Sequence, residues 1–229
     1  MWQVKSKQRV VAHGEVFTAE REVKAMCDLV KSETERIDSR FLEPACGEGN
    51  FLLEILARKL AVVKRKYHRS VYDYERNSLL ALGSLYGVDI LYDNVIACRK
   101  RLYTYWDNQY KVVCRKKCSK ETRQAARFIL SRNIVCGNAL TLRCVDEDGN
   151  DTDEPIVFSE WTFPFNNALM QRKDYTFDEL LNGSSSGKRF SQGVLFEKTD
   201  LYNRGEGKFL RHHIAHYRRL HENAGSRLI

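Results

Sequence analysis

The sequence predicts an α/β fold in which parallel strands alternate with helices. The short apolar strand at residues 40–42 is followed by a glycine-bearing turn and by apolar residues at helical spacing from Phe51 onward. The same order recurs at residues 84–90, an apolar run that ends in an acid and precedes a second helical pattern. Strands that alternate with helical patterns are typical of a parallel sheet.

Length and composition agree with this fold class. The 229 residues are enough for one α/β domain, and 43% hydrophobic and 30% charged residues are ordinary for a globular protein. No apolar run approaches the ~20 residues of a membrane helix, and the first residues lack the apolar centre of a signal peptide. The seven scattered cysteines fit reduced thiols better than disulfides. We therefore expect a cytoplasmic protein with no membrane partner, and the net charge of +8 suggests a polyanionic partner.

The turn at residues 43–50 can bring the backbone close to a ligand. Gly47 and Gly49 have no Cβ and can adopt positive φ, and a helix N-terminus with unpaired N–H groups follows them. The turn lacks the Gly-Lys-Ser/Thr of a phosphate-binding loop and the full G-x-G-x-x-G of a dinucleotide site. Glu43 and Glu48 would repel a pyrophosphate, but they suit a ligand with a cationic end, such as S-adenosylmethionine.

Two segments resemble motifs of a known family. The run Phe41-Leu-Glu-Pro-Ala-Cys-Gly-Glu-Gly-Asn-Phe51 resembles the first motif of adenine-specific DNA methyltransferases of the restriction-modification type, F-L-E-P-A-C-G-x-G-x-F/L. Gly14-Glu-Val-Phe-Thr18 resembles their upstream G-x-V-F/Y-T-P segment, with Ala19 in place of the proline. The resemblance covers roughly residues 1–140. It implies a Rossmann-like class I S-adenosylmethionine-dependent methyltransferase fold, truncated here after the fourth strand. The alternative is an ordinary strand, turn and helix with chance glycines.

The resemblance also implies which residues bind the cofactor. Phe17 and Thr18 would line its methionine end, and Thr18 is also the expected N-cap of the first helix. Asp89 stands where doubly wound folds have an acid for the ribose hydroxyls, and the alternative is a helix N-cap. In the family, an acid at the position of Asn138 accepts a hydrogen bond from the adenine amino group, and the amide oxygen of Asn138 would take its place. The alternative role of Asn138 is to form a simple turn. The implied set is Phe17, Thr18, Glu43, Pro44, Ala45, Cys46, Gly47, Gly49, Asn50, Asp89, Ile90, Asn138 and Ala139.

The stretch at residues 98–133 is basic and has aromatic residues interleaved. Such a stretch suits a phosphate backbone, which contributes affinity without sequence information. We assign DNA binding to Arg115, Lys116 and Lys117, and the alternative is a solvated helix face. Cys114 and Cys118 are not followed by a second pair at zinc-site spacing, so no metal site is predicted.

The last third of the chain is expected to be an appendage. A solvated hairpin turn at residues 146–154 precedes a strand at 155–163, and Thr176 and Glu179 form a capping box for a short helix. The four histidines His212, His213, His216 and His221 are expected on a basic, solvent-facing helix. The predicted parts are an N-terminal loop and helix at 1–33, an S-adenosylmethionine-binding core at 34–165, and an appendage with short helices and a flexible loop at 166–229.

Adenine methylation needs a base clamp that the sequence does not contain. The family follows its fourth strand with D/N/S-P-P-Y/F/W, whose polar and aromatic side chains hold the flipped base. The only prolines are at 44, 155 and 164, and Phe163-Pro-Phe-Asn-Asn167 is a poor substitute. The chain resembles the short M-subunit-like members of the family. The resemblance implies a DNA adenine methyltransferase, or a subunit whose partner supplies target recognition and the base pocket, and no catalytic residue is assigned. One alternative is a noncatalytic S-adenosylmethionine-binding or DNA-binding module, and another is methylation of RNA or a different substrate.

Overall fold

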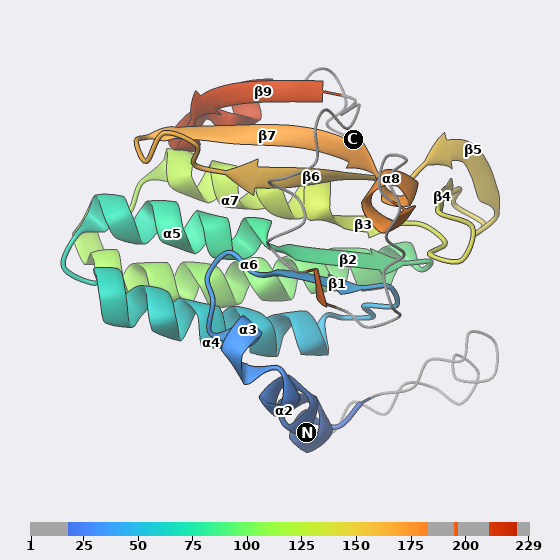
Figure 1. Ribbon diagram of the computed structural model, residues 1–229, viewed down its shortest axis with the longest axis horizontal. Coiled ribbons are helices and arrows are strands. Elements are labelled where there is room, and N and C mark those ends of the chain that lie inside the picture. The colour runs from blue at the N-terminus through green and yellow to red at the C-terminus, as the bar shows by residue number, and fades with distance from the viewer. Residues whose placement is uncertain (1–17, 183–194, 197–210, 224–229) are drawn as a thin grey trace.

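A parallel sheet forms the centre of the protein, as the sequence predicts. The computed structural model describes residues 18–182, 195–196 and 211–223. The strands of this sheet are β1 (Arg40–Glu43), β2 (Leu85–Asp89), β3 (Ile134–Cys136) and β8 (Leu195–Phe196). Their order is β3-β2-β1-β8, with β1, β2 and β3 parallel and the short β8 antiparallel to β1. The carboxyl ends of the three parallel strands therefore lie along one edge, which we call the carboxyl edge (Figure 1).

Each crossover between the parallel strands contains two helices. The helical elements are α4 (Asn50–Tyr67) and α5 (Val71–Gly83) before β2, then α6 (Tyr92–Cys114), the 3₁₀ turn η1 (Arg115–Lys117) and α7 (Lys120–Asn133) before β3. Ser70 and Ser119 cap α5 and α7, because each hydroxyl oxygen accepts a hydrogen bond from the N–H three residues later. No helix among the described residues is both long enough and apolar enough to span a membrane.

The first described helix begins differently from the prediction. Helix α2 (Glu20–Leu29) has Ala19 as its N-cap, so the expectation that Thr18 caps it is wrong. The methyl group of Ala19 cannot accept a hydrogen bond, but the Glu22 carboxylate accepts one from the Ala19 N–H at 3.3 Å. Glu20 and Glu22 lie in the first turn, where negative charge is favoured. The short helix α3 (Lys31–Thr34) then leads into β1.

A second, antiparallel sheet contains much of the predicted appendage. Its strands are β6 (Val157–Thr162), β7 (Leu169–Thr176) and β9 (Arg211–His216), in the order β6-β7-β9. The strand predicted at 155–163 is present as β6, but it pairs with β7 and does not continue the parallel sheet as a fourth strand. The predicted boundary between residues 165 and 166 falls in the turn between β6 and β7.

The expectation of a solvent-facing C-terminal helix is wrong. Residues 211–216 form β9, and the following 3₁₀ segment η2 (Tyr217–Asn223) buries Tyr217 and Leu220. His212 and His216 are four residues apart, which is close to one helical turn and is also two full periods of a strand. Their spacing therefore could not distinguish the two structures.

Two local predictions in this region are confirmed. The hairpin of β4 (Arg143–Val145) and β5 (Asp151–Pro155) turns at residues 146–150, so the turn is shorter than the predicted 146–154. Asp146 accepts hydrogen bonds from the N–H groups of Asp148 and Asn150 at 3.0 and 2.9 Å. Helix α8 (Phe177–Asn182) begins with the predicted capping box. The Thr176 N–H donates to the Glu179 carboxylate at 2.8 Å, and the Glu179 N–H donates to the Thr176 hydroxyl at 3.1 Å.

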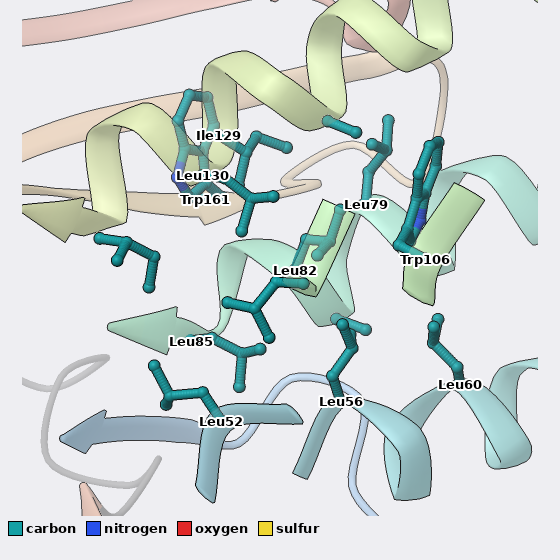
Figure 2. Close-up of a cluster of buried hydrophobic side chains, with 14 of the residues drawn as sticks. Leu52, Leu56, Leu60, Leu79, Leu82, Leu85, Trp106, Ile129, Leu130 and Trp161 are labelled. Carbon is teal, nitrogen blue, oxygen red and sulfur yellow. The ribbon is translucent and has the colours of Figure 1, made fainter. Parts of the chain in front are cut away.

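The parallel sheet is buried on both faces. Its helix side packs on a cluster that includes Leu52, Leu56, Leu82, Leu85, Trp106 and Ile129 (Figure 2). Its other side packs on a smaller cluster formed by Leu42, Tyr86, Val88, Ile156, Phe158 and Phe177. Adjacent residues of a strand point to opposite faces, so strands covered on both faces have continuous apolar sequences. This explains why the run at 84–90 does not alternate.

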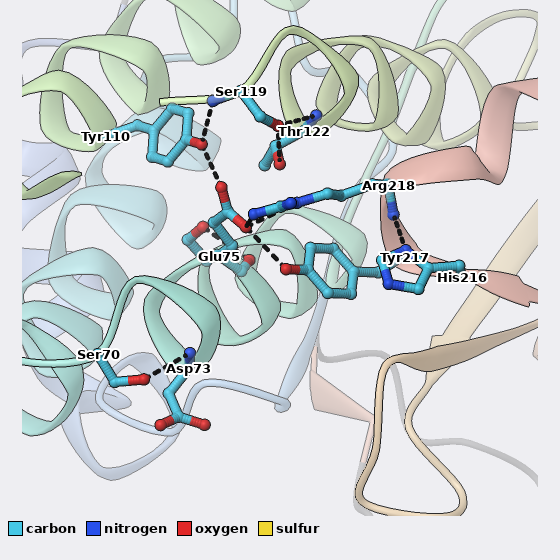
Figure 3. A network of polar contacts seen from close by, with 10 residues as sticks. Ser70, Asp73, Glu75, Tyr110, Ser119, Thr122, His216, Tyr217 and Arg218 are labelled. Atoms are coloured by element: carbon cyan, nitrogen blue, oxygen red, sulfur yellow. Dashed lines mark hydrogen bonds and ion pairs between the residues drawn. The ribbon is translucent and has the colours of Figure 1, made fainter. Parts of the chain in front are cut away.

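The buried carboxylate of Glu75 joins η2 to the helices (Figure 3). It accepts hydrogen bonds from the hydroxyl groups of Tyr110 and, at 2.7 Å, Tyr217. The guanidinium of Arg218 donates two more to it, at 2.6 and 3.0 Å. Burying a charge is costly unless it is paired and hydrogen-bonded. These contacts satisfy Glu75 and hold η2 against α5 and α6.

Candidate cofactor-binding edge

The turn between β1 and α4 lies at the carboxyl edge. Gly47 and Gly49 have φ angles of +50° and +83°, a region in which other residues are strained. A Cβ on Gly49 would lie 2.5 Å from the Cys98 sulfur, so this glycine lets the turn pack on α6. A Cβ on Gly47 would have no heavy atom within 4 Å. Gly47 therefore exposes bare backbone to open space, which is the geometry that close approach of a ligand requires.

Asp89 connects this turn to the end of β2. One of its carboxylate oxygens accepts a hydrogen bond from the Gly47 N–H at 2.8 Å, and the other accepts bonds from the Leu91 N–H and the Asn94 amide at 2.9 and 3.1 Å. A carboxylate has about four acceptor positions, so three of them are used within the protein. The N-cap of α6 is Leu91, so the alternative N-cap role for Asp89 is wrong. Ribose binding through the remaining acceptor position stays a prediction.

Backbone hydrogen bonds bring the segments after the three parallel strands together. The Cys46 N–H donates to the Val88 carbonyl at 2.8 Å, and the Gly137 N–H donates to the Asp89 carbonyl at 3.0 Å. Three of the implied cofactor residues are exposed (Pro44, Ala45, Ile90), three are buried (Cys46, Gly49, Asp89), and five are half-buried (Glu43, Gly47, Asn50, Asn138, Ala139). The structure thus places the implied residues of β1, β2 and β3 along one edge.

The upstream segment lies almost entirely outside the residues that the structure describes. Phe17 lies outside the described residues. Thr18 is half-buried just before α2, and it makes no hydrogen bond with the turn within the part of the chain that the structure describes. Contact of Phe17 and Thr18 with a cofactor therefore stays a prediction from the resemblance.

Glu43 ends β1 beside the open turn. Its carboxylate is half-buried, and this burial raises its pKa, while a backbone hydrogen bond from Ala45 acts in the opposite direction. Within the described residues Glu43 forms no ion pair, whereas Glu48 lies 3.9 Å from the guanidinium of Arg101. A cationic group placed next to Glu43 would favour its charged form. Of the two acids that the sequence associated with a cationic ligand, Glu43 is therefore the better candidate.

Arg101 has a role that the sequence did not reveal. Its guanidinium donates to the Glu48 carbonyl at 2.8 Å and to the Asn50 side chain at 2.9 Å, so it supports the turn from α6. Cys98, one helical turn earlier, packs under Gly49. In the sequence both residues belong to the basic stretch, and no local pattern connects them with a turn about 50 residues earlier in the chain.

The thiol of Cys46 is buried beneath the turn. A hydrogen bond with Cys98 and burial both raise its pKa above the ordinary value. The thiol is therefore protonated at neutral pH, and we assign it packing and no nucleophilic role. All seven cysteines lie in the described residues and are free thiols. Among these residues no group of three or more His, Cys, Asp or Glu side chains could hold a metal ion.

Asn138 shapes the turn that follows β3. Its amide nitrogen donates to Asp151 at 3.1 Å, and its amide oxygen accepts from the Leu140 N–H at 3.0 Å. Its backbone also pairs with Arg143 at the base of the β4–β5 hairpin. The alternative role in a turn is therefore confirmed. Its oxygen retains a second lone pair, so the adenine contact stays a prediction.

The basic stretch divides into two groups in the structure. Several of its side chains have partners inside the protein: Arg99 donates to the Ile134 and Ser131 carbonyls, Lys111 and Arg123 both pair with Asp107, and Arg132 lies near Asp174. Arg115, Lys116 and Lys117 are exposed in η1, at the far end of α6. The 23 residues of α6 span about 34 Å at 1.5 Å per residue. The predicted DNA-binding residues therefore do not lie beside the carboxyl edge.

The segment at residues 163–167 is also remote from the carboxyl edge. The Asn166 side chain accepts a hydrogen bond from Arg76 at 3.2 Å, and Arg76 follows Glu75 on α5. Glu75 in turn binds Tyr110, which lies in the second half of α6. Trp161 is only 4% exposed and packs against Phe128. The turn between β6 and β7, which contains residues 163–167, is therefore at the end of the molecule opposite the arrowheads of β1 and β2 (Figure 1).

Comparison with known proteins provides no relative for this chain, since no family model, no curated protein and no solved structure matches it. A small cavity between the sheet and α8 is lined by Leu42, Tyr86, Phe158 and Phe177, and none of the implied cofactor residues lines it. The geometry of the carboxyl edge is therefore the feature that bears on function.

Proposed function

We propose that this chain binds S-adenosylmethionine at the carboxyl edge and acts as the cofactor-binding subunit of a DNA adenine methyltransferase. In open α/β sheets, ligands bind outside the carboxyl ends of the strands, where the strand order reverses. In the order β3-β2-β1-β8, that place is next to β1, where the Gly47 turn lies. The proposal includes a Rossmann-like class I methyltransferase fold for this part of the chain.

One observation supports the choice of ligand more than any other. The open backbone at Gly47 lies beside the half-buried Glu43, which has no cationic partner among the described residues. S-adenosylmethionine has an ammonium group and a sulfonium group, so its cationic end would compensate Glu43. A phosphate-bearing nucleotide would instead place negative charge near a carboxylate whose pKa burial already raises.

The proposal assigns the base pocket to a partner subunit. The candidate substitute for the missing polar-Pro-Pro-aromatic clamp, residues 163–167, lies at the opposite end of the molecule. Positioning alone can supply ~7 to 11 kcal/mol of barrier reduction, so a chain without a clamp loses most of the rate even with cofactor bound. We expect the purified chain to transfer little or no labelled methyl to mixed-sequence DNA on its own.

Isothermal titration calorimetry with S-adenosylmethionine and S-adenosylhomocysteine tests cofactor binding. Gly47→Ala should weaken binding at least tenfold, about 1.4 kcal/mol, because its Cβ enters the space proposed for the ligand. Gly149→Ala is a matched control. Gly149 also has positive φ, +82°, and a Cβ at this position would have no heavy atom within 4 Å, but it lies in the β4–β5 hairpin.

Glu43→Gln tests the charge separately from the shape. It should cost ~1.5 to 3 kcal/mol of binding free energy, the range for a hydrogen bond to a charged group. If neither ligand produces heat or a thermal shift at millimolar concentration, the proposal is wrong. Equal losses in the Gly47→Ala and Gly149→Ala proteins would show that backbone strain alone caused the effect.

The second candidate function is a noncatalytic S-adenosylmethionine-binding module. The position of residues 163–167 favours this function, because these residues are too far from the open turn to hold a flipped base beside the proposed cofactor site. A methyl-transfer assay with the partner subunit present distinguishes the two functions. A chain that binds the cofactor but never supports transfer would be the module.

A further inference from the structure

Two basic turns lie at the end of the molecule opposite the carboxyl edge. The first joins α4 to α5, and the second, η1, joins α6 to α7. Figure 1 places both turns on the side away from the arrowheads of β1 and β2. The sequence drew attention only to the second turn. We call the two together the basic end, formed by Lys64, Arg65, Lys66, Arg69, Arg115, Lys116, Lys117 and Lys120.

The packing of α4 on α6 places the two turns at the same level. Helices α4 and α6 each follow one of two parallel strands at the carboxyl edge, so they run in the same direction. Near this edge the Asn50 side chain contacts Arg101, 51 positions later, at 2.9 Å. With the same offset, Lys64 is level with Arg115 and Lys66 with Lys117. Axes of packed helices are about 8 to 10 Å apart, so the two turns form one continuous surface.

The basic end has a high positive charge that is not compensated within the described residues. All eight side chains are exposed, and none forms an ion pair with another residue in the described ranges. The only acidic residue within 64–70 and 115–121 is Glu121. By contrast, Arg99, Arg123 and Arg132 earlier and later on the same helices have internal partners. The cations of these two turns are therefore available to a partner outside the protein.

The backbone at Arg115 is an additional feature of this surface. Arg115 has φ of +51° and ψ of −122°, a conformation that residues other than glycine rarely adopt. Backbone strain of this kind clusters at binding and functional sites. Glycine would adopt this backbone conformation without strain. The turn alone therefore does not explain why residue 115 is an arginine.

We propose that the basic end binds the phosphate backbone of duplex DNA, at a distance from the carboxyl edge. The distance along α4 from Asn50 to Lys66 is about 24 Å at 1.5 Å per residue. Phosphate neutralisation supplies affinity without an apolar contact. A membrane surface fits less well, because interfacial helices insert an apolar face, and the apolar residues of the last turns of α4, Val62 and Val63, are buried in the core. The inference does not depend on cofactor binding.

The experiment measures binding of the full chain to a fluorescent 20-base-pair duplex of mixed sequence over a range of salt concentrations. Arg65→Gln/Lys66→Gln removes two charges from the first turn, and Lys116→Gln/Lys117→Gln removes two from the second. Each pair should make the log-log salt slope less negative by about 1 to 2, since each phosphate contributes about −0.9. The four changes together should reduce affinity more than either pair. Arg21→Gln/Lys24→Gln, with the same charge change on the exposed face of α2, is the control and should alter affinity less than twofold.

Arg115→Gly separates binding from folding. It should leave the melting temperature unchanged or raise it, and it should still weaken duplex binding. Gly47→Ala should bind the duplex as the unmodified chain does, so failure of the cofactor proposal can be told apart from failure of this one. The inference would be overturned if duplex binding did not depend on salt, or if changes in only one of the two turns weakened it. It would also be overturned if the control variant lost as much affinity, or if the chain bound phosphatidylserine vesicles but not the duplex.

Discussion

Replacing Glu75 by glutamine should destabilise the protein by about 3 kcal/mol. Glu75 is fully buried and accepts hydrogen bonds from Tyr110, Tyr217 and Arg218 (Figure 3). Removing one partner of a buried ion pair costs ~3 to 5 kcal/mol. We expect the lower end of this range, because the Arg218 side chain is 36% exposed and water partly compensates it. Urea unfolding followed by tryptophan fluorescence and circular dichroism measures the change.

A double-mutant cycle tests whether this loss comes from the ion pair. Arg218→Gln leaves Glu75 buried without its cation, so it should also be strongly destabilising. The double variant should cost less than the sum of the two single changes, by ~1 to 3 kcal/mol. Cleavage by trypsin near Arg218 and Arg219 should become faster in Glu75→Gln, because η2 loses its main polar contacts. A loss below ~1 kcal/mol, or strict additivity, would refute this account of the network.

Two further predictions concern buried polar groups. Burial lowers the pKa of Lys59 from 10.5 to about 7. At a pH between these two values, the Lys59 amine therefore carries a proton in the unfolded chain but not in the folded chain. Stability relative to Lys59→Met should therefore rise from pH 7 to pH 9, by at most ~1.4 kcal/mol per pH unit, and a constant difference in urea titrations would contradict this. Asn133 donates to the Gly83 carbonyl and accepts from the Ser159 N–H, each at 3.1 Å. Asn133→Leu should lower the free energy of unfolding by ~2 to 4 kcal/mol, because the Gly83 carbonyl and the Ser159 N–H both lose their hydrogen-bond partner. The control Asn108→Leu, at an exposed position, should change it by less than ~0.5 kcal/mol.

Local signals in the sequence were sufficient for the elements around the carboxyl edge. The β2 strand is an uninterrupted apolar run that ends in Asp89, and the start of α4 follows two glycines that have positive φ. The capping box of α8 depends on residues only three positions apart. These features are short-range, since φ preference, capping and strand burial act within a few residues. The helix at Asn50 and the parallel sheet were therefore predictable.

Only the tertiary structure decided which side chains support the turn and where the charged residues lie. Arg101 holds a turn about 50 positions earlier, and Arg218 neutralises Glu75 across 143 positions, so neither contact leaves a local pattern. Residues 211–216 form a strand because β7 offers hydrogen-bonding partners, while their histidine spacing suits a helix equally well. The sequence showed that η1 is basic, but the length and register of α4 and α6 placed it beside a second basic turn and away from Gly47. Such contacts depend on how whole helices pack, which the spacing of residues along the chain does not encode.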